Sequence, residues 1–114
     1  RYAGLKIIAS HGAGALPYLI GRLDQCFRNI PACRTKTEAA PSSYMGRLFA
    51  DSVVFTQQTL DLCLEVFGDE HVLYGSDYPH TIGDPVRCLA QVNALHGARR
   101  EKVRGGNAQR IFRF

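Results

Sequence analysis

A histidine surrounded by small residues is the first candidate for chemistry in this sequence. His11 lies in the segment at residues 10–14, which reads SHGAG and follows an apolar run. Small neighbours leave room for a substrate beside the imidazole and let backbone N–H groups approach it. Because an imidazole titrates near neutral pH, the segment predicts a general acid/base. A histidine that only caps the following helix would show the same spacing, so this alternative stays open.

An aspartate after a later apolar run is the second candidate. Asp77 lies in the segment at residues 74–80, which reads YGSDYPH. A carboxylate that directly follows a strand can bind a metal ion or exchange a proton. A turn aspartate close to a proline can also be purely structural, and the sequence does not separate the two. Asp77 and His80 are not a zinc site by themselves, since zinc takes at least three protein ligands.

An arginine in the predicted helix after His11 is the third candidate. Arg22 lies in the segment GRLD at residues 21–24. A guanidinium binds a carboxylate through two parallel hydrogen bonds, so Arg22 can hold an acidic substrate if it turns toward His11. An arginine on a helix surface beside an aspartate, here Asp24, more often forms a surface ion pair, and this alternative also stays open.

A nucleotide-binding half-sheet is a weaker alternative. Gly12 and Gly14 supply the G-x-G start of a dinucleotide fingerprint, but its third glycine would fall at Pro17. The acidic residue that binds the ribose is expected about 20 residues further on. Residues 33–37 contain no acidic residue, which argues against this class.

Three strands, each followed by a helix, are predicted to position these candidates. Apolar runs predict strands at residues 5–10, 49–55 and 71–75, and apolar residues at helical spacing follow at 16–27, 60–67 and 86–93. This alternation predicts the α/β class, with parallel strands joined by crossover helices. Ligands bind at the carboxyl ends of such strands, where His11 and Asp77 fall. The pattern fits either the end of a TIM barrel or half of a doubly wound sheet.

The boundaries of these elements also follow from residue types. The predicted boundaries are Thr56 and Asp84 as N-caps, Gly68 and Gly97 as helix ends, and Asn107 as the N-cap of a last helix that follows a short basic one. Residues 29–43 contain two prolines and are predicted to form a long loop. The first and third strands are expected to have unpaired edges, which favour self-association.

Composition restricts the possible classes of function. The 114 residues suit one domain, and no apolar run approaches the roughly 20 residues of a membrane span, so we expect no membrane partner. Residues 98–114 hold six basic residues and one acidic residue, without aromatic residues between positions 99 and 104. This pattern favours a solvated helix surface over nucleic-acid binding. The four cysteines form no C-x-x-C pair, so we expect a reduced, cytoplasmic protein.

Three segments together resemble a known family. They are residues 11–18 (HGAGALPY) with 21–24 (GRLD), residues 73–80 (LYGSDYPH) and residues 105–108 (GGNA). In this order and spacing they resemble the amidohydrolase-related metal-dependent decarboxylases, especially the aminocarboxymuconate-semialdehyde decarboxylase type and its hydroxybenzoate decarboxylase relatives. The resemblance implies a distorted TIM barrel with a divalent metal, usually zinc, at its mouth.

The resemblance also implies roles for the three candidates. Asp77 matches the metal-binding catalytic aspartate after the last strand, and His11 matches the histidine that serves as acid/base for the metal-bound water. Arg22 matches an arginine that holds a substrate carboxylate. A metal lowers the pKa of bound water, a histidine moves its proton, and an arginine fixes the acid group. One departure is Ala13, which stands where the family commonly has glycine.

These observations lead to one expectation and one alternative. A full barrel takes about 250 residues, whereas this chain begins at Arg1, has its only methionine at Met45 and lacks the family's H-x-H ligand pair. We expect residues 1–114 to be the C-terminal three β/α units of a single (β/α)8 barrel domain. The parent would be a homo-oligomeric metal-dependent carboxy-lyase or hydrolase acting on a small carboxylate substrate. The alternative is a catalytically inactive structural or interaction module that retains barrel units.

Overall fold

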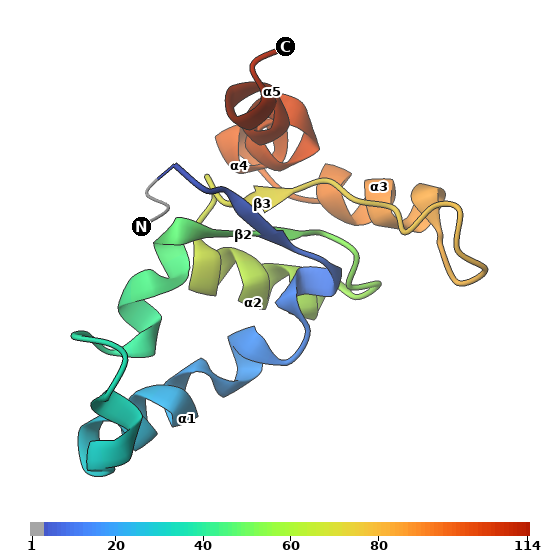
Figure 1. The fold of residues 1–114 in the computed structure, drawn as a ribbon. Helices are drawn as coiled ribbons and strands as arrows, with labels where there is room; N and C mark the ends of the chain where they lie inside the picture. Colours follow the sequence, from blue (N-terminus) through green and yellow to red (C-terminus); the bar gives the residue numbers. More distant parts are fainter. Residues whose placement is uncertain (1–3) are drawn as a thin grey trace.

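Three short strands form a parallel sheet in the computed structural model, which describes residues 4–114 (Figure 1). The strands are β1 (Ile7–Ala9), β2 (Leu48–Asp51) and β3 (Val72–Leu73). Their order in the sheet is β1-β2-β3, with Ile7 opposite Leu48 and Asp51 opposite Leu73. Both pairs of neighbouring strands are parallel, which confirms the predicted α/β class with a parallel sheet.

All three strands are shorter than predicted, and the end of β2 is displaced furthest from its predicted position. The apolar run predicts a strand over residues 49–55, but β2 ends at Asp51. Beyond it, Val54 N–H donates to the Ser52 carbonyl at 3.0 Å, and Thr56 N–H donates to the Val54 carbonyl at 2.8 Å. Bonds that span two residues fold the backbone into tight turns. The apolar residues 53–55 therefore lie in a turn rather than in the strand.

A helix follows each strand, as predicted. The helices are α1 (Leu16–Asn29), α2 (Gln57–Phe67), α3 (Pro85–Asn93), α4 (Gly97–Glu101) and α5 (Asn107–Phe112). Thr56 caps α2 by accepting a hydrogen bond from Thr59 N–H at 3.3 Å, and Asp84 caps α3 by accepting one from Arg87 N–H at 2.8 Å. Both predicted N-caps are confirmed. No helix within residues 4–114 is long and apolar enough to cross a membrane.

The two predicted glycine stops have different outcomes. Gly68 follows the last residue of α2 with a φ of 86°, which confirms the prediction. The prediction for Gly97 is wrong, because α3 already ends at Asn93 and Gly97 begins α4 with a φ of 56°. Left-handed φ values suit glycine because it has no Cβ.

The sheet has an apolar cluster on each face. Successive residues of a strand point to opposite faces. On one face, Ala50 and Val72 belong to a buried cluster with residues of α2, among them Leu60 and Leu64. On the other face, Phe49 and Leu73 pack with Ile111 of α5. Figure 1 shows α2 beneath the sheet and α5 above it, so both faces are covered at β2 and β3.

The segment between α1 and β2 is more ordered than a loop. The sequence predicts a loop over residues 29–43, whereas α1 continues to Asn29 and two short 3₁₀ helices follow, at Pro31–Arg34 and Pro41–Arg47. Asp24 of α1 accepts a hydrogen bond from Ser42 N–H at 2.9 Å, which holds the second of these helices. Asp24 pairs with Arg28 at 3.7 Å, so the ion pair considered for Arg22 forms with a different arginine.

The C-terminal segment is one irregular helix rather than two. α4 continues through a π-helical turn at Lys102–Gly106 directly into α5. The prediction that Asn107 is an N-cap is therefore wrong, because its backbone is helical on both sides. Its side chain is buried instead, and it donates to the carbonyls of Asp69 at 2.7 Å and Val72 at 2.8 Å.

These contacts also change the expected edge at β3. The His71 carbonyl accepts a hydrogen bond from the N–H group of Ala50 in β2. Since the backbone groups of successive strand residues point to alternate sides, those of Val72 and Tyr74 point away from β2. The Val72 carbonyl is bound by Asn107, and Tyr74 N–H donates to the Val103 carbonyl at 2.9 Å. The C-terminal helix thus occupies the side of β3 that the sequence left open.

Candidate active site

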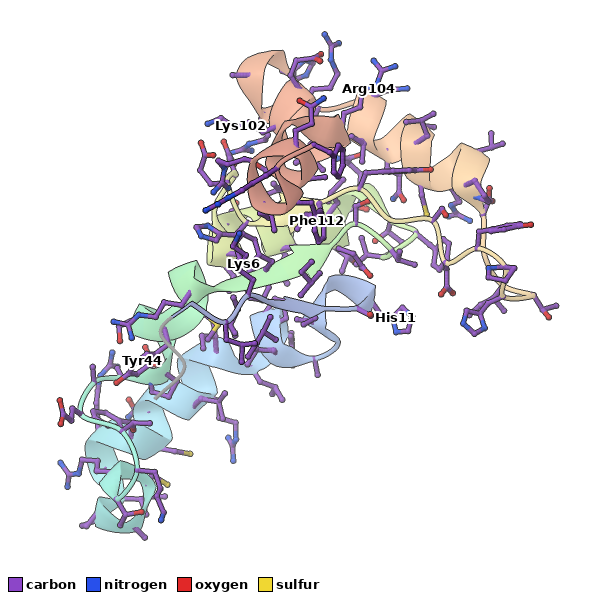
Figure 2. The ribbon with its side chains drawn as sticks, turned by 45° about the horizontal axis from the view of Figure 1, so that its top comes forward. Lys6, His11, Tyr44, Lys102, Arg104 and Phe112 are labelled. Atoms are coloured by element: carbon purple, nitrogen blue, oxygen red, sulfur yellow. The ribbon has the colours of Figure 1, made fainter. Side chains whose placement is uncertain are left out.

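His11 and Asp77 lie together at the carboxyl end of the sheet. Nε2 of His11 is 3.3 Å from Oδ1 of Asp77, although 66 positions separate them in the sequence. The side chain of His11 is 64% exposed, whereas that of Asp77 is 9% exposed. Figure 2 shows His11 beyond the carboxyl end of β1, at the opposite end of that strand from Lys6. The structure therefore brings an accessible imidazole against a mostly buried carboxylate.

A left-handed turn presents His11. The φ angles of the four residues from His11 to Gly14 are 57°, 59°, 63° and 60°. Two hydrogen bonds close the turn, from Ala13 N–H to the Ser10 carbonyl at 3.1 Å and from Gly14 N–H to the His11 carbonyl at 2.9 Å. For a residue with a Cβ, this conformation is less favourable than the right-handed one by about 1–2 kcal/mol. His11 and Ala13 both carry this strain, and such strain is common at functional sites.

Gly12 anchors the turn to the rest of the protein. Its N–H donates to Oδ1 of Asp51 at 3.0 Å, and its carbonyl accepts from the Cys63 thiol at 3.5 Å. Burial, with a smaller contribution from nearby Asp51, raises the pKa of Cys63 to about 11, so the thiol keeps the proton that it donates. A Cβ at Gly12 would lie 2.5 Å from Cγ1 of Val54 and 2.9 Å from Sγ of Cys63. Only glycine fits this position.

The loop after β3 folds back over Asp77. Asp77 has a φ of 60°, and a cis peptide joins Tyr78 to Pro79. The Asp77 carbonyl accepts a hydrogen bond from His80 N–H at 2.9 Å. A Cβ at Gly83 would lie 2.6 Å from that same carbonyl oxygen, so the backbone of Gly83 packs directly on it. These contacts fix the backbone from which the Asp77 carboxylate projects.

A cavity of about 640 Å³ opens beside the pair. It is lined by residues of three loops at the carboxyl ends of the strands and by one residue of α2, namely His11, Val53, Val54, Phe55, Thr59, Asp77, His80, Thr81 and Ile82. Phe55 has a φ of 55° and sits at the centre of a tight turn. The apolar wall was not predicted, because residues 53–55 look like the continuation of a strand and Ile82 is an isolated apolar residue in a loop.

Arg22 does not join this site within residues 4–114. Its side chain lines a separate hollow on α1 together with Gln25, Cys26, Asn29 and Ile30. None of these residues lines the cavity at His11. The packing of α1 therefore places Arg22 outside the lining of the cavity at His11, which sequence spacing alone does not show.

The donor groups at the site partly fit a divalent metal. The Asp77 carboxylate is mostly buried, and His11 is the side chain that contacts it within residues 4–114. A carboxylate oxygen and an imidazole nitrogen both bind divalent metals. Within the described part of the chain, no group of three His, Cys, Asp or Glu side chains converges to hold a metal ion. Asp77 thus fits as one ligand of a set that needs further protein donors.

Comparison with known proteins identifies the family. The amidohydrolase family matches residues 1–114. The chain belongs to the amidohydrolase family. The 2-amino-3-carboxymuconate-6-semialdehyde decarboxylase of Dictyostelium discoideum is 30% identical over 111 residues, which are 95% of this chain and 31% of that protein. The gamma-resorcylate decarboxylase of Polaromonas sp. is 29% identical and aligns with 100% of this chain and 36% of that protein. This amidohydrolase chain spans about a third of the length of these relatives.

Solved structures show the same fold. The 5-carboxyvanillate decarboxylase LigW of Sphingomonas paucimobilis has a TM-score of 0.82 and 27% identity, over 96% of this chain and 34% of that one. A dihydroxybenzoic acid decarboxylase of Polaromonas sp., solved with bound manganese and the inhibitor 2-nitroresorcinol, has a TM-score of 0.76 and 28% identity, over 98% and 35%. These neighbours are TIM-barrel decarboxylases. They confirm the resemblance drawn from the motifs and give no support to an inactive module.

Proposed function

We propose that this chain supplies the last three β/α units of a TIM barrel in a metal-dependent decarboxylase of small aromatic or unsaturated carboxylates. The observation that carries the proposal is the 3.3 Å approach of His11 Nε2 to Asp77 Oδ1 at the carboxyl end of a parallel sheet. Active sites of TIM barrels lie at that end. The similarity to decarboxylases over nearly the whole chain supports this reaction class.

In this proposal Asp77 is a metal ligand. Its carboxylate is mostly buried, and its backbone is fixed by the loop that folds over it, so it offers a preorganised oxygen donor. A divalent metal, zinc or manganese, supplies a Lewis acid that stabilises negative charge on the bound substrate. The other protein ligands come from outside these residues.

His11 is the proton-transfer residue in this proposal. When a carboxylate leaves as CO2, the electron pair of the broken carbon–carbon bond stays on the substrate carbon, which then takes up a proton. The side chain of His11 is 64% exposed, and its Nε2 faces Oδ1 of Asp77 at 3.3 Å. Histidine is the usual general acid/base side chain of enzymes, so His11 can deliver a proton to that carbon or to bound water.

The apolar wall of the cavity suits the same reaction. Val53, Phe55 and Ile82 line one side of the space next to His11 and Asp77. An apolar surface disfavours a charged carboxylate far more than neutral CO2. The wall therefore buries the hydrocarbon part of the substrate and favours loss of the charged group. The proposal does not depend on Arg22, whose predicted role in binding the carboxylate stays a prediction.

The test is CO2 release by the full-length protein loaded with Mn²⁺ or Zn²⁺. The compounds to test are gamma-resorcylate, which appears in the name of the Polaromonas relative, and other small aromatic and unsaturated carboxylates. We expect metal-dependent CO2 release from at least one of them. His11→Ala should lose most of this CO2 release. Its matched control is His96→Ala, since His96 lies in the segment before α4 and does not line the cavity. Hydrolysis of an amide or ester with no CO2 release from any carboxylate would contradict the proposal.

A further inference from the structure

We infer that Asp51 and Ser52 are positioning residues that together hold His11 and Asp77 at their 3.3 Å separation. The inference rests on the proposed function of that pair. Asp51 is the last residue of β2, and Ser52 follows it. β1 and β3 each pair with β2 and not with each other, so β2 is the strand that the loops of His11 and Asp77 share.

Asp51 holds the loop that carries His11. Its Oδ1 accepts two backbone hydrogen bonds, from Gly12 N–H at 3.0 Å and from Val53 N–H at 3.0 Å. Gly12 directly follows His11 in the left-handed turn. One carboxylate oxygen thus bridges the turn that carries His11 and the segment after β2. Asp51 therefore ties the strained turn to the end of β2 and opposes its relaxation.

Ser52 holds the loop that carries Asp77. Its side chain is fully buried, and its Oγ accepts a hydrogen bond from Gly75 N–H at 3.1 Å. Gly75 lies two residues before Asp77, beyond the last residue that pairs with β2. A Cβ at Gly75 would lie 2.8 Å from Cγ2 of Val53 and 3.1 Å from Cβ of Asp51. The backbone of Gly75 thus packs against the side chains of Val53 and Asp51, beside its hydrogen bond to Ser52.

Both residues act through backbone groups rather than on the reacting atoms. The bonds of Asp51 and Ser52 described above end on main-chain N–H groups next to the catalytic pair. Misplacement of a catalytic group by about 1 Å can lower the rate by about 100-fold. Loss of either bond should therefore lower kcat and leave KM nearly unchanged. An amide at position 51 keeps an acceptor oxygen, so Asp51→Asn should retain most of the activity.

Amide hydrogen exchange tests the two bonds separately and without any activity. In the full-length protein, Asp51→Ala should accelerate exchange of the Gly12 amide about fivefold or more and leave Gly75 unchanged. Ser52→Ala should do the reverse. Asp61→Ala and Ser43→Ala, at exposed positions, should change neither amide. Unchanged exchange at Gly12 in Asp51→Ala, or at Gly75 in Ser52→Ala, would overturn the inference whether or not the proposed function holds.

Kinetics of the same variants test the consequence for catalysis. For the metal-loaded enzyme we expect Asp51→Ala and Ser52→Ala to lower kcat about 10- to 100-fold, with KM within about threefold and metal content unchanged. Asp51→Asn should retain at least about a third of kcat.

An Asp51→Asn enzyme as slow as Asp51→Ala would show that the charge itself acts and would overturn the positioning role. If Asp51→Ala does not fold, an unchanged kcat in Ser52→Ala would still overturn it. A wild-type protein that releases no CO2 contradicts the proposed function instead.

Discussion

The side-chain amide of Asn107 donates to the carbonyl oxygen of Val72 at 2.8 Å and thereby ties the last helix to β3. The same amide donates to the Asp69 carbonyl, before the strand begins. Just before it, the π-helical turn brings the Val103 carbonyl to Tyr74 N–H. The GGNA motif at residues 105–108 therefore belongs to the support of the strand that leads to Asp77, although it lies 30 residues further along the chain.

The first prediction concerns this contact. Asn107→Ala leaves two carbonyl oxygens without their donor, and a lost hydrogen bond to a buried group costs about 1–3 kcal/mol. We expect the free energy of unfolding of the full-length protein to fall by about 2 kcal/mol or more in a urea titration. Asn93→Ala, at an exposed position at the end of α3, is the matched control and should change it by less than about 0.5 kcal/mol. Equal effects of the two substitutions would show that the Asn107 contacts contribute little.

A second prediction separates crowding from backbone strain at the His11 turn. Gly12 and Gly97 both have left-handed φ values, 59° and 56°. A Cβ at Gly12 would collide with Val54 and Cys63, whereas a Cβ at Gly97 would meet nothing within 4 Å. Gly97→Ala should therefore lower the free energy of unfolding only by the conformational penalty of about 1–2 kcal/mol. Gly12→Ala adds overpacking of about 1–3 kcal/mol and should also displace His11. Thermal melts and kcat measure both effects, and a Gly12→Ala enzyme as stable as Gly97→Ala would refute the packing argument.

The sequence predicts the order of elements far better than their ends. The three strand–helix units, the caps at Thr56 and Asp84 and the positions of His11 and Asp77 after strands all follow from local patterns. The end of β2 does not, because residues 53–55 are apolar for the cavity wall rather than for a sheet. That Arg22 lines a separate hollow also does not follow, since this depends on how α1 packs in three dimensions.

A third prediction separates the roles proposed for the catalytic pair. In the full-length protein, Asp77→Ala removes the oxygen donor, so we expect loss of both bound metal and activity. His11→Ala should keep the metal and lose about 10²–10⁴-fold in turnover, the usual contribution of a general acid/base. Elemental analysis after dialysis, paired with CO2 release, measures both quantities. Loss of the metal in His11→Ala, or turnover near that of the wild type, would contradict the assignment of His11.

A fourth prediction concerns the pH dependence of stability. The hydrogen bond from Ser42 N–H, helped by Arg28, lowers the pKa of Asp24 below its ordinary value of 3.8. A carboxyl group with a lower pKa in the folded state stabilises the fold above its unfolded pKa and loses this effect as the pH falls through the folded pKa. Asp24→Asn should therefore be less stable than the wild type at pH 7, and the difference should shrink below about pH 4. Urea titrations across pH measure it, with Asp61→Asn, at an exposed position of α2, as the control. A difference that stays constant from pH 7 to pH 2 would contradict the role of the Asp24 charge.

The last prediction concerns the 114-residue chain on its own. The sequence predicts open edges at both outer strands, but the C-terminal helix binds Val72 and Tyr74 along β3. β1 is left as the exposed strand, with Ile7 48% and Ile8 38% exposed. Unpaired strand edges are templates for pairing with another chain, and a lysine on such an edge opposes it. We therefore expect the isolated chain to self-associate at micromolar concentration in light scattering, and Ile8→Lys to suppress the association. Ile82→Lys, at a loop isoleucine that is 74% exposed, is the matched control and should not suppress it. A wild-type chain that stays monodisperse and monomeric, with a sharp cooperative melt, would show that these residues form a complete domain and that the edge of β1 needs no partner.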